Sequence, residues 1–263
     1  MWYNQGIMIR EIFTGTSGYD YPEWKGLFYP EALPRKDYLA YYATQFNGLE
    51  LNNTFYSMPD TKRISSFVER TEEKVAFCIK ACRCFTHERS SLWMQQAYNF
   101  KKALEPMTQK ALVLSVLFQL PHNFLYTAEN RKYLAQLLEE FKDLPCTVEF
   151  RNAAWIKPSV FEGLAQRKAS LAFCDMPAPV NADGNVTTNF TGPVAYCRLH
   201  ARNKNAWYAT DSTERFYYSK EELKKFVSVV KLASEEGRNP AVFFNRSADG
   251  VRNAMEFREM ILR

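Results

Sequence analysis

Short apolar runs alternate with longer amphipathic segments along the whole chain. The apolar runs are rich in Val, Ile, Leu and Phe, which favours extended structure in buried positions. They predict strands at Ile9–Gly15, Leu49–Asn53, Val75–Ala81, Leu112–Leu120, Thr147–Arg151, Ser170–Asp175, Val194–His200 and Ala241–Asn245. The segments between most of them repeat apolar residues at the spacing of a helix face. They predict helices at Arg35–Phe46, Thr61–Arg70, Leu92–Leu104, Glu129–Phe141, Pro158–Arg167, Lys220–Glu235 and Asp249–Leu262.

This alternation predicts an α/β protein with a parallel sheet. Eight strands with helices between most of them are typical of a single (β/α)8 TIM-type barrel. The main rival is an open doubly wound sheet, but no G-x-G-x-x-G fingerprint follows the first strand. No low-complexity linker divides the chain. We therefore expect one domain over residues 1–263, with residues 1–8 as a short N-terminal extension.

Composition is that of a globular protein, whereas the net charge says little about which partner it binds. The chain is 46% hydrophobic and 24% charged, and its net charge of +5 mildly favours an anionic partner. No apolar run reaches the ~18–20 residues of a membrane span, and the first residues do not resemble a secretory signal. We expect a cytoplasmic protein without a membrane partner. Its six cysteines then read as small buried side chains, because they lack paired C-x-x-C knuckles.

The main functional signal is the position of polar residues within the predicted strands. In a barrel of this kind the site lies at the C-terminal ends of the strands. Most polar residues fall late in these strands, where the apolar run stops. They are Glu50, Asn52, Lys80, Gln119, Glu149, Arg151, Asp175, Arg198, His200 and Asn245, with Arg83 and His87 just after the third strand. Side chains alternate faces along a strand, so Glu149 and Arg151 share one face.

Charges inside a barrel need partners or a purpose, and two interpretations are open. The charges form a self-neutralising ionic network, or they line a polar pocket for a ligand. For the second, we take Glu50 and Glu149 as acid–base candidates, Arg151, Lys80 and Arg198 as anion contacts, and His200 or His87 as the proton shuttle. Desolvation would lower the pKa of Lys80 and make it a nucleophile or general base. A structural pair of Lys80 with Glu50 is the alternative for that residue.

Ordered motifs along the chain resemble one known family. They are GTSGYDYPEWKGLFYP and LELNNTFY near the start, followed by FCIKACRCFTH, LFQLP, VEFRNAAW, YCRLHARN and VFFN. From about Ile12 to Met260 the chain resembles the YecE-like proteins, domain-of-unknown-function family 72. The resemblance implies a TIM-type barrel and no firmly established reaction. An endonuclease IV-like role has been suggested for such proteins by analogy of fold.

The resemblance also implies which positions belong to the site. Besides most of the strand-end residues above and His87, these are Gly18, Tyr19, Trp24, Tyr29, Pro30, Phe55, Tyr56, Thr86, Pro121 and Trp155. Three positions depart from the family pattern. Ala201 stands where such proteins often have Gly, Arg246 stands where a second Asn often follows Asn245, and the FCDMP context of Asp175 matches less closely.

These observations lead to one functional hypothesis and two alternatives. The leading hypothesis is an anionic, phosphate- or nucleotide-bearing substrate at the barrel mouth, contacted also by Asn52, Tyr56, His87, Gln119, Trp155 and Asn245. If the protein is an enzyme, it is then a hydrolase of a phosphate-containing substrate. The first alternative is a metal-dependent, endonuclease IV-like phosphodiesterase. The chain has only three His, which is few for a zinc cluster, so a divalent cation stays open without being favoured and no metal ligands are assigned. The second alternative is a non-catalytic nucleic-acid-binding module, and no protein partner is inferred.

Overall fold

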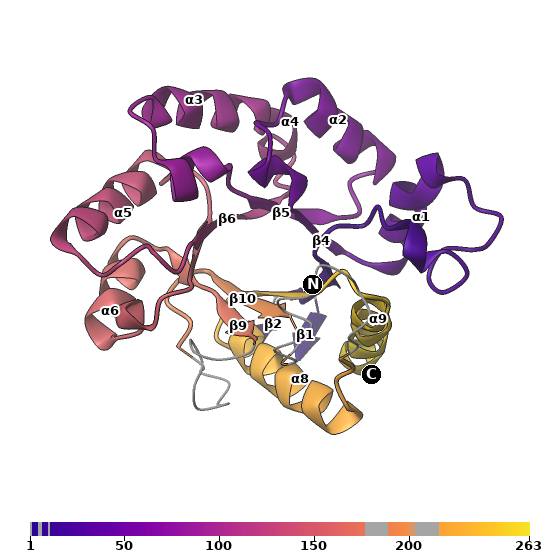
Figure 1. Ribbon diagram of the computed structural model, residues 1–263. Coiled ribbons are helices and arrows are strands. Elements are labelled where there is room, and N and C mark those ends of the chain that lie inside the picture. The colour runs from indigo at the N-terminus through magenta and orange to yellow at the C-terminus, as the bar shows by residue number, and fades with distance from the viewer. Residues whose placement is uncertain (1, 5–6, 10, 177–188, 201, 203–215) are drawn as a thin grey trace.

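Parallel strands form a ring that helices surround on the outside in the computed structural model (Figure 1). The structure describes residues 2–4, 7–9, 11–176, 189–200, 202 and 216–263. The strands of the ring are β3 (Phe13–Thr16), β4 (Gly48–Leu51), β5 (Ala76–Lys80), β6 (Val113–Leu120), β7 (Cys146–Phe150), β8 (Ser170–Leu171), β9 (Phe173–Asp175), β10 (Val194–Leu199) and β11 (Asn239–Phe244). A strand is therefore present in each of the eight predicted strand regions.

The strands form two parallel sheets that meet on both sides of the ring. One sheet has the order β4-β5-β6-β7-β8 and the other the order β3-β11-β10-β9. On one side, β8 and β9 are separated only by Ala172 and together make the predicted sixth strand. On the other side, a parallel bridge joins Ser17 to Glu50, and Gly18 N donates to the backbone oxygen of Glu50 at 2.8 Å. The fold is thus the predicted (β/α)8 barrel.

The helices begin and end close to the predicted positions. They are α1 (Tyr38–Gln45), α2 (Thr61–Arg70), α3 (Trp93–Ala103), α4 (Glu105–Thr108), α5 (Ala128–Glu140), α6 (Pro158–Gln166), α8 (Lys220–Glu235) and α9 (Ala248–Leu262). Short helical turns lie at Pro22–Trp24, Arg35–Asp37, Asn53–Phe55, Cys84–Glu88 and Ala153–Trp155. Asp60 caps α2, because its side chain accepts a hydrogen bond from Arg63 N at 2.9 Å.

The bounds of the first predicted strand are wrong. Ile9 belongs to β2 (Ile7–Ile9), which pairs antiparallel with β1 (Trp2–Asn4), whereas the barrel strand begins at Phe13. The residues around Ile9 are as apolar as those of β3, so hydrophobicity alone does not mark the boundary. The loop expected after β5 also contains a π-helical turn.

The strands separate two apolar layers, and this separation positions the site. Residues such as Val148 and Phe150 of β7 pack in the large outer core between strands and helices. The inside of the barrel holds a smaller apolar cluster of Cys78, Leu114, Leu117, Val194, Tyr196, Ala241 and Phe243. Because faces alternate along β7, Glu149 lies on the inner side, opposite to Val148. Charged side chains therefore share the barrel interior with this small cluster.

Candidate functional site

Three strands bring Glu50, Glu149 and Arg198 together inside the barrel. Arg198 Nε and Nη2 donate to the two oxygens of the Glu50 carboxylate at 2.8 and 2.7 Å. Its Nη1 donates to Glu149 Oε2 at 2.5 Å. The three side chains are 3%, 0% and 1% exposed for Arg198, Glu50 and Glu149, respectively. Guanidinium is suited to this arrangement because its planar fork can serve two carboxylates at once.

Further donors complete the coordination of both carboxylates. Ser17 Oγ donates to Glu50 Oε1 at 2.8 Å, and the Tyr196 hydroxyl donates to Glu50 Oε2 at 2.7 Å. Each oxygen of Glu50 therefore accepts two hydrogen bonds. Arg151 Nε donates to Glu149 Oε1. We call the cluster of Glu50, Glu149, Arg151, Arg198 and Tyr196 the buried network.

The buried network keeps both carboxylates ionised at neutral pH. Burial by itself would raise the pKa of the Glu50 carboxyl, but the charge and hydrogen bonds of Arg198 outweigh it and lower the pKa to about 2. Burial acts on Glu149 in the same way, and Arg198 with Arg151 holds the pKa of its carboxyl well below the usual range. Neither carboxyl carries a proton that it could donate near neutral pH.

His200 lies beside the buried network and is neutral. Burial lowers the pKa of its imidazole, and the nearby cations Arg198 and Arg151 lower it further, to well below its usual range. Backbone hydrogen bonds fix the position of this residue after β10. His200 N donates to Asp175 O at 2.9 Å, and Asn245 Nδ2 donates to His200 O at 3.1 Å.

Lys80 at the end of β5 is a cation of a different kind. Its Nζ lies 4.4 Å from the centroid of the Phe55 ring. The His87 ring also packs against Phe55, with the two ring centroids 4.9 Å apart. Burial lowers the pKa of the Lys80 ammonium to about 8, helped by Arg198, although Glu149 and Glu50 oppose the shift. Among the described residues, no carboxylate oxygen lies within 4.0 Å of Lys80 Nζ.

Most charged side chains at this end of the barrel are paired. In the buried network two glutamates face two arginines, and Arg202 binds both Asp175, with both oxygens 2.9 Å from Nε, and Glu222, with Oε1 2.7 Å from Nη1. Lys80 is left as a positive charge without a carboxylate partner in the part of the chain that the structure describes. The predicted pair of Lys80 with Glu50 is thus absent as a direct contact, because Arg198 already occupies both oxygens of Glu50.

Polar groups with unused hydrogen-bonding capacity follow β4, in the turn whose Thr54 hydroxyl donates to Lys80 O at 2.6 Å. The Oδ1 atoms of Asn52 and Asn53, which directly follow β4, are buried and accept no hydrogen bond from any described residue. Tyr56 follows them and is 75% exposed. On β6, Gln119 lies beside Glu149 in the register of the sheet.

Two residues predicted to contact a ligand also pack against other parts of the protein. The Trp155 ring is 2% exposed and stacks on both Phe124 and Phe150, with centroids 5.2 and 4.7 Å away, and its Nε1 donates to Phe124 O at 2.7 Å. Asn245 uses Oδ1 to accept from Ser247 N and Oγ at 3.0 and 2.6 Å, and so shapes the start of α9.

Two members of the site are absent from the sequence-based prediction. Tyr196 and Ser17 both donate to Glu50, yet Tyr196 reads as an apolar core residue within β10 and Ser17 as part of a loop. A period-two signal was available for Tyr196, because it precedes Arg198 by two residues and therefore shares its face. Ala201, one of the positions that depart from the family pattern, lies outside the described residues.

The described residues contain no group of three or more His, Cys, Asp or Glu side chains arranged to hold a metal ion. Their six cysteines are buried and form no disulfide with one another. In the described part of the chain, no helix is both long and apolar enough to span a membrane.

Comparison with known proteins decides the family. A family model described as "Protein of unknown function DUF72" matches residues 13–263. The chain belongs to the DUF72 family. Over 258 residues it is 27% identical to the UPF0759 protein YunF of Bacillus subtilis, which covers 91% of this chain and 90% of YunF. The resemblance inferred from the motifs is therefore confirmed.

Solved structures of DUF72 proteins have the same fold. A DUF72 family protein from Thermotoga maritima superposes with a TM-score of 0.84 at 28% identity, covering 96% of this chain and 99% of that one. Another, from Enterococcus faecalis, gives a TM-score of 0.80 at 21% identity, covering 97% and 99%, and so supports the fold alone. The α/β architecture with parallel sheets is therefore shared across the family, whose function these relatives leave open.

Proposed function

We propose that the barrel mouth of this DUF72 protein binds an anionic ligand that carries a phosphate group, with Lys80 as its main charged contact. The observation that carries the proposal is that no carboxylate oxygen of the described residues lies within 4.0 Å of Lys80 Nζ. Holding an ammonium group in a partly buried place without a carboxylate costs free energy, which a bound anion would offset. The lowered pKa of Lys80, about 8, reflects the same cost.

The buried network supports this role by fixing the surroundings of Lys80. Its two carboxylates are engaged by Arg198, Arg151, Tyr196 and Ser17, so they add little competition for an incoming anion. Arg151 keeps 15% of its side chain exposed and is a second cation for the ligand. We therefore assign Glu50, Glu149 and Arg198 a positioning role and Lys80 and Arg151 the contact with the anion.

A nucleotide fits these surroundings better than inorganic phosphate alone. Tyr56 is 75% exposed and offers a ring face on which a base can stack. Asn52 and Asn53, whose buried Oδ1 atoms have no hydrogen-bond partner among the described residues, lie four and three residues before Tyr56. These groups follow β4, next along the chain to the Phe55 ring that packs against Lys80.

If the ligand is hydrolysed, the proton-transfer groups differ from the pair of glutamates expected at first. The carboxyl of Glu50 is ionised and accepts four hydrogen bonds, whereas Lys80 has a pKa of about 8, close to neutral. The neutral imidazole of His200 is the second candidate. We therefore place acid–base function, if the protein is a phosphate hydrolase, on Lys80 and His200.

The metal-dependent phosphodiesterase alternative receives less support from the same geometry. A divalent cation would need the oxygens of Glu50 and Glu149, which already bind guanidinium groups. Binding a metal there would leave Arg198 buried without its partners. The nucleic-acid-binding alternative shares its aromatic and cationic contacts with the nucleotide site, and the experiment below separates the two.

The test measures binding of AMP and of inorganic phosphate to the wild type and to Lys80→Met by calorimetry. We expect AMP to bind more tightly than phosphate and Lys80→Met to weaken both by at least about tenfold, the effect of one charge-assisted contact. Lys102→Met is the matched control, because Lys102 is exposed in the last turn of α3, far from the strand ends. Equal affinities in the wild type and Lys80→Met would refute the proposal.

A single-stranded oligonucleotide, measured in the same series, distinguishes the binding module from the nucleotide site. A module that follows the backbone would bind it far more tightly than AMP, with affinity falling steeply as salt rises. A mononucleotide site predicts similar affinities for AMP and for each oligonucleotide end. Tyr56→Ala should weaken AMP but not inorganic phosphate.

A further inference from the structure

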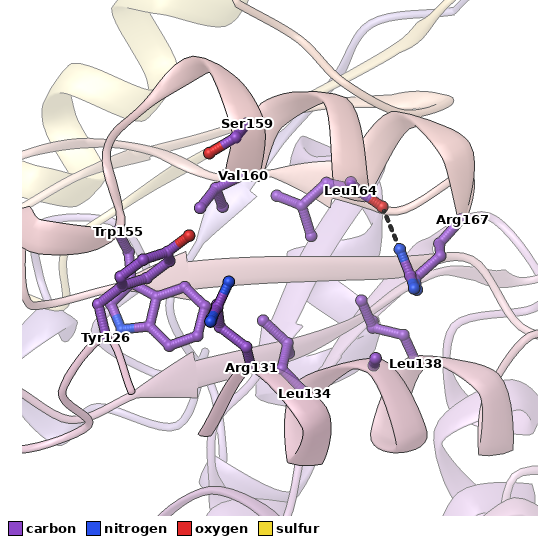
Figure 2. A pocket seen from close by; sticks show the side chains of 11 residues that line it. Tyr126, Arg131, Leu134, Leu138, Trp155, Ser159, Val160, Leu164 and Arg167 are labelled. Atoms are coloured by element: carbon purple, nitrogen blue, oxygen red, sulfur yellow. Dashed lines mark hydrogen bonds between the residues drawn. The ribbon is translucent and has the colours of Figure 1, made fainter. Parts of the chain in front are cut away.

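A cavity lies outside the barrel, between helices α5 and α6. Its volume is about 280 Å³. Residues of α5 and α6 line it, together with Tyr126 before α5 and Trp155 before α6. Figure 2 shows the side chains of α5 and α6 facing each other across this space. The buried network contributes none of these residues, so the cavity is separate from the site at the barrel mouth.

The walls of the cavity are aliphatic. Leu134 and Leu138 come from α5, and Val160 and Leu164 come from α6 (Figure 2). All four are buried and 2% to 9% exposed. Trp155 borders the cavity, but its ring stacks on both Phe124 and Phe150. The space therefore suits an alkyl chain rather than a stacked aromatic ring.

Three cations lie around this aliphatic space: Arg131 and Lys157 lie beside the Tyr126 ring, and Arg167 lies at the other end from Tyr126 (Figure 2). The Arg131 Cζ atom lies 5.1 Å from the centroid of the Tyr126 ring, and Lys157 Nζ lies 3.8 Å from the same centroid. Arg167 reaches the cavity from α6 and donates from Nη1 to Gly163 O at 2.9 Å (Figure 2). No carboxylate of the described residues lies within 4.0 Å of any of these three cations. The cavity thus combines apolar walls with positive charge that is not neutralised locally.

We infer that this cavity binds a small amphipathic acid, with its carboxylate at Arg131 and Lys157 and a short alkyl chain between α5 and α6. A planar guanidinium pairs with a carboxylate through two parallel hydrogen bonds. A cavity of about 150 Å³ holds benzene, so one of about 280 Å³ accommodates a chain of about six to eight carbons. A neutral alcohol would leave the cations without an anion, and a protein segment would not fit the volume.

The first experiment titrates octanoate into the protein and follows the indole N–H signals by NMR. Trp155 and Trp24 are both buried and both donate from Nε1 to a backbone oxygen, at 2.7 and 2.9 Å. Only Trp155 borders the cavity, so octanoate should shift its signal saturably and leave that of Trp24 unchanged. Butyrate and 1-octanol, which lack the chain or the charge, should bind at least about tenfold more weakly.

The second experiment tests which residues hold the acid. Arg131→Gln should weaken octanoate binding about tenfold, whereas Lys132→Gln, an exposed neighbour on α5 that does not line the cavity, should leave it unchanged. Ala135→Leu fills the cavity from α5 and should abolish binding. If this variant loses its fold, Leu164→Phe provides the same test from α6. Lys80→Met should have no effect, because the mouth and the cavity are separate.

Two results would overturn the inference. One is the absence of a saturable Trp155 shift at octanoate concentrations of about 10 mM, well above the dissociation constants of ordinary small-molecule sites. The other is a wild-type affinity in both Arg131→Gln and Ala135→Leu, which would place octanoate elsewhere. Loss of AMP binding in Lys80→Met bears only on the mouth site and leaves this inference intact.

Discussion

Lys80 and Arg198 are both cations inside the same barrel, but their surroundings give them different properties. Arg198 donates three hydrogen bonds to two carboxylates, and Glu149 and Glu50 hold its pKa well above the usual value despite burial. Lys80 Nζ lies over the face of Phe55, with no carboxylate oxygen of the described residues within 4.0 Å, and burial lowers its pKa to about 8. Arg198 is thus held by two carboxylates, whereas the buried ammonium group of Lys80 is costly to the fold.

Replacing Lys80 should therefore stabilise the protein at neutral pH. The folded-state pKa of about 8 lies below the ordinary value of 10.5, so the folded state binds the proton more weakly than the unfolded chain. At pH 7 this costs about 1–3 kcal/mol of folding free energy, which Lys80→Met removes. Stability of the wild type should rise between pH 8 and 10.5 relative to the variant. Chemical denaturation across this pH range measures it, and a destabilised variant at pH 7 would contradict the account.

Glu50→Gln should have the opposite effect. It leaves two arginines and only Glu149 in the buried network, and an uncompensated buried charge of this kind typically costs about 3–5 kcal/mol. The pKa of Glu50 is lowered from 4.5 to about 2, so its contribution is present above pH 4.5 and is lost as the pH falls towards 2. Urea denaturation should therefore find the variant less stable at pH 7 and less sensitive to acid.

A surface carboxylate provides the comparison for that measurement. Glu236→Gln removes an exposed pair with Arg238 and should cost less than about 1 kcal/mol. Equal losses in Glu50→Gln and Glu236→Gln would show that the buried network does not stabilise the fold.

At the scale of elements, β3 and β4 approach each other so closely that only glycine fits between them. A Cβ atom on Gly15 would lie 1.9 Å from Gly48 O and 2.5 Å from the Tyr42 hydroxyl. This junction brings Ser17 next to Glu50 and so joins the two sheets where the buried network begins. The sequence of β3 shows a glycine here, but the contact that requires it is visible only in three dimensions.

Gly15→Ala should destabilise the barrel by about 3 kcal/mol or more, because backbone has to move to admit the methyl group. Gly163→Ala is the matched control. Gly163 lies inside α6, and the nearest atom to an added Cβ, in the flexible Arg167 side chain, is 3.8 Å away. This control should gain about 0.5–1 kcal/mol from the higher helix propensity of alanine. Thermal unfolding of both variants tests the prediction, and a neutral Gly15→Ala would disprove the close approach.

The alternation of side chains between the two faces of each strand predicted much of the site. It placed Glu50, Glu149 and Arg198 on inner faces, and all three meet inside the barrel. It did not predict which acid binds which base, because that depends on how strands distant in sequence are staggered. Trp155 is a second case in which the sequence was insufficient. Its position after β7 was predicted, but its packing against Phe124 and Phe150 depends on Phe124, which lies in the loop after β6.

For the molecule as a whole, the alternation of strands and helices was sufficient to predict the barrel. Each short apolar strand can bury both faces only in a parallel sheet covered by helices, and eight such units close on themselves. Closure itself rests on local details, namely the break at Ala172 between β8 and β9 and the bridge from Ser17 to Glu50. The cavity between α5 and α6 was not predicted either, because it is set by the spacing of two helices.

The central claim is that an anion at the barrel mouth neutralises Lys80. NMR of ¹³C-labelled lysine methylene groups measures it most directly, by following the titration of Lys80 without and with saturating AMP and identifying the signal through Lys80→Met. The account predicts a pKa of about 8 for Lys80 in the free protein and a clear rise when AMP is bound, because a neighbouring phosphate favours the charged ammonium. A Lys80 titration that is the same with and without bound AMP would contradict the claim.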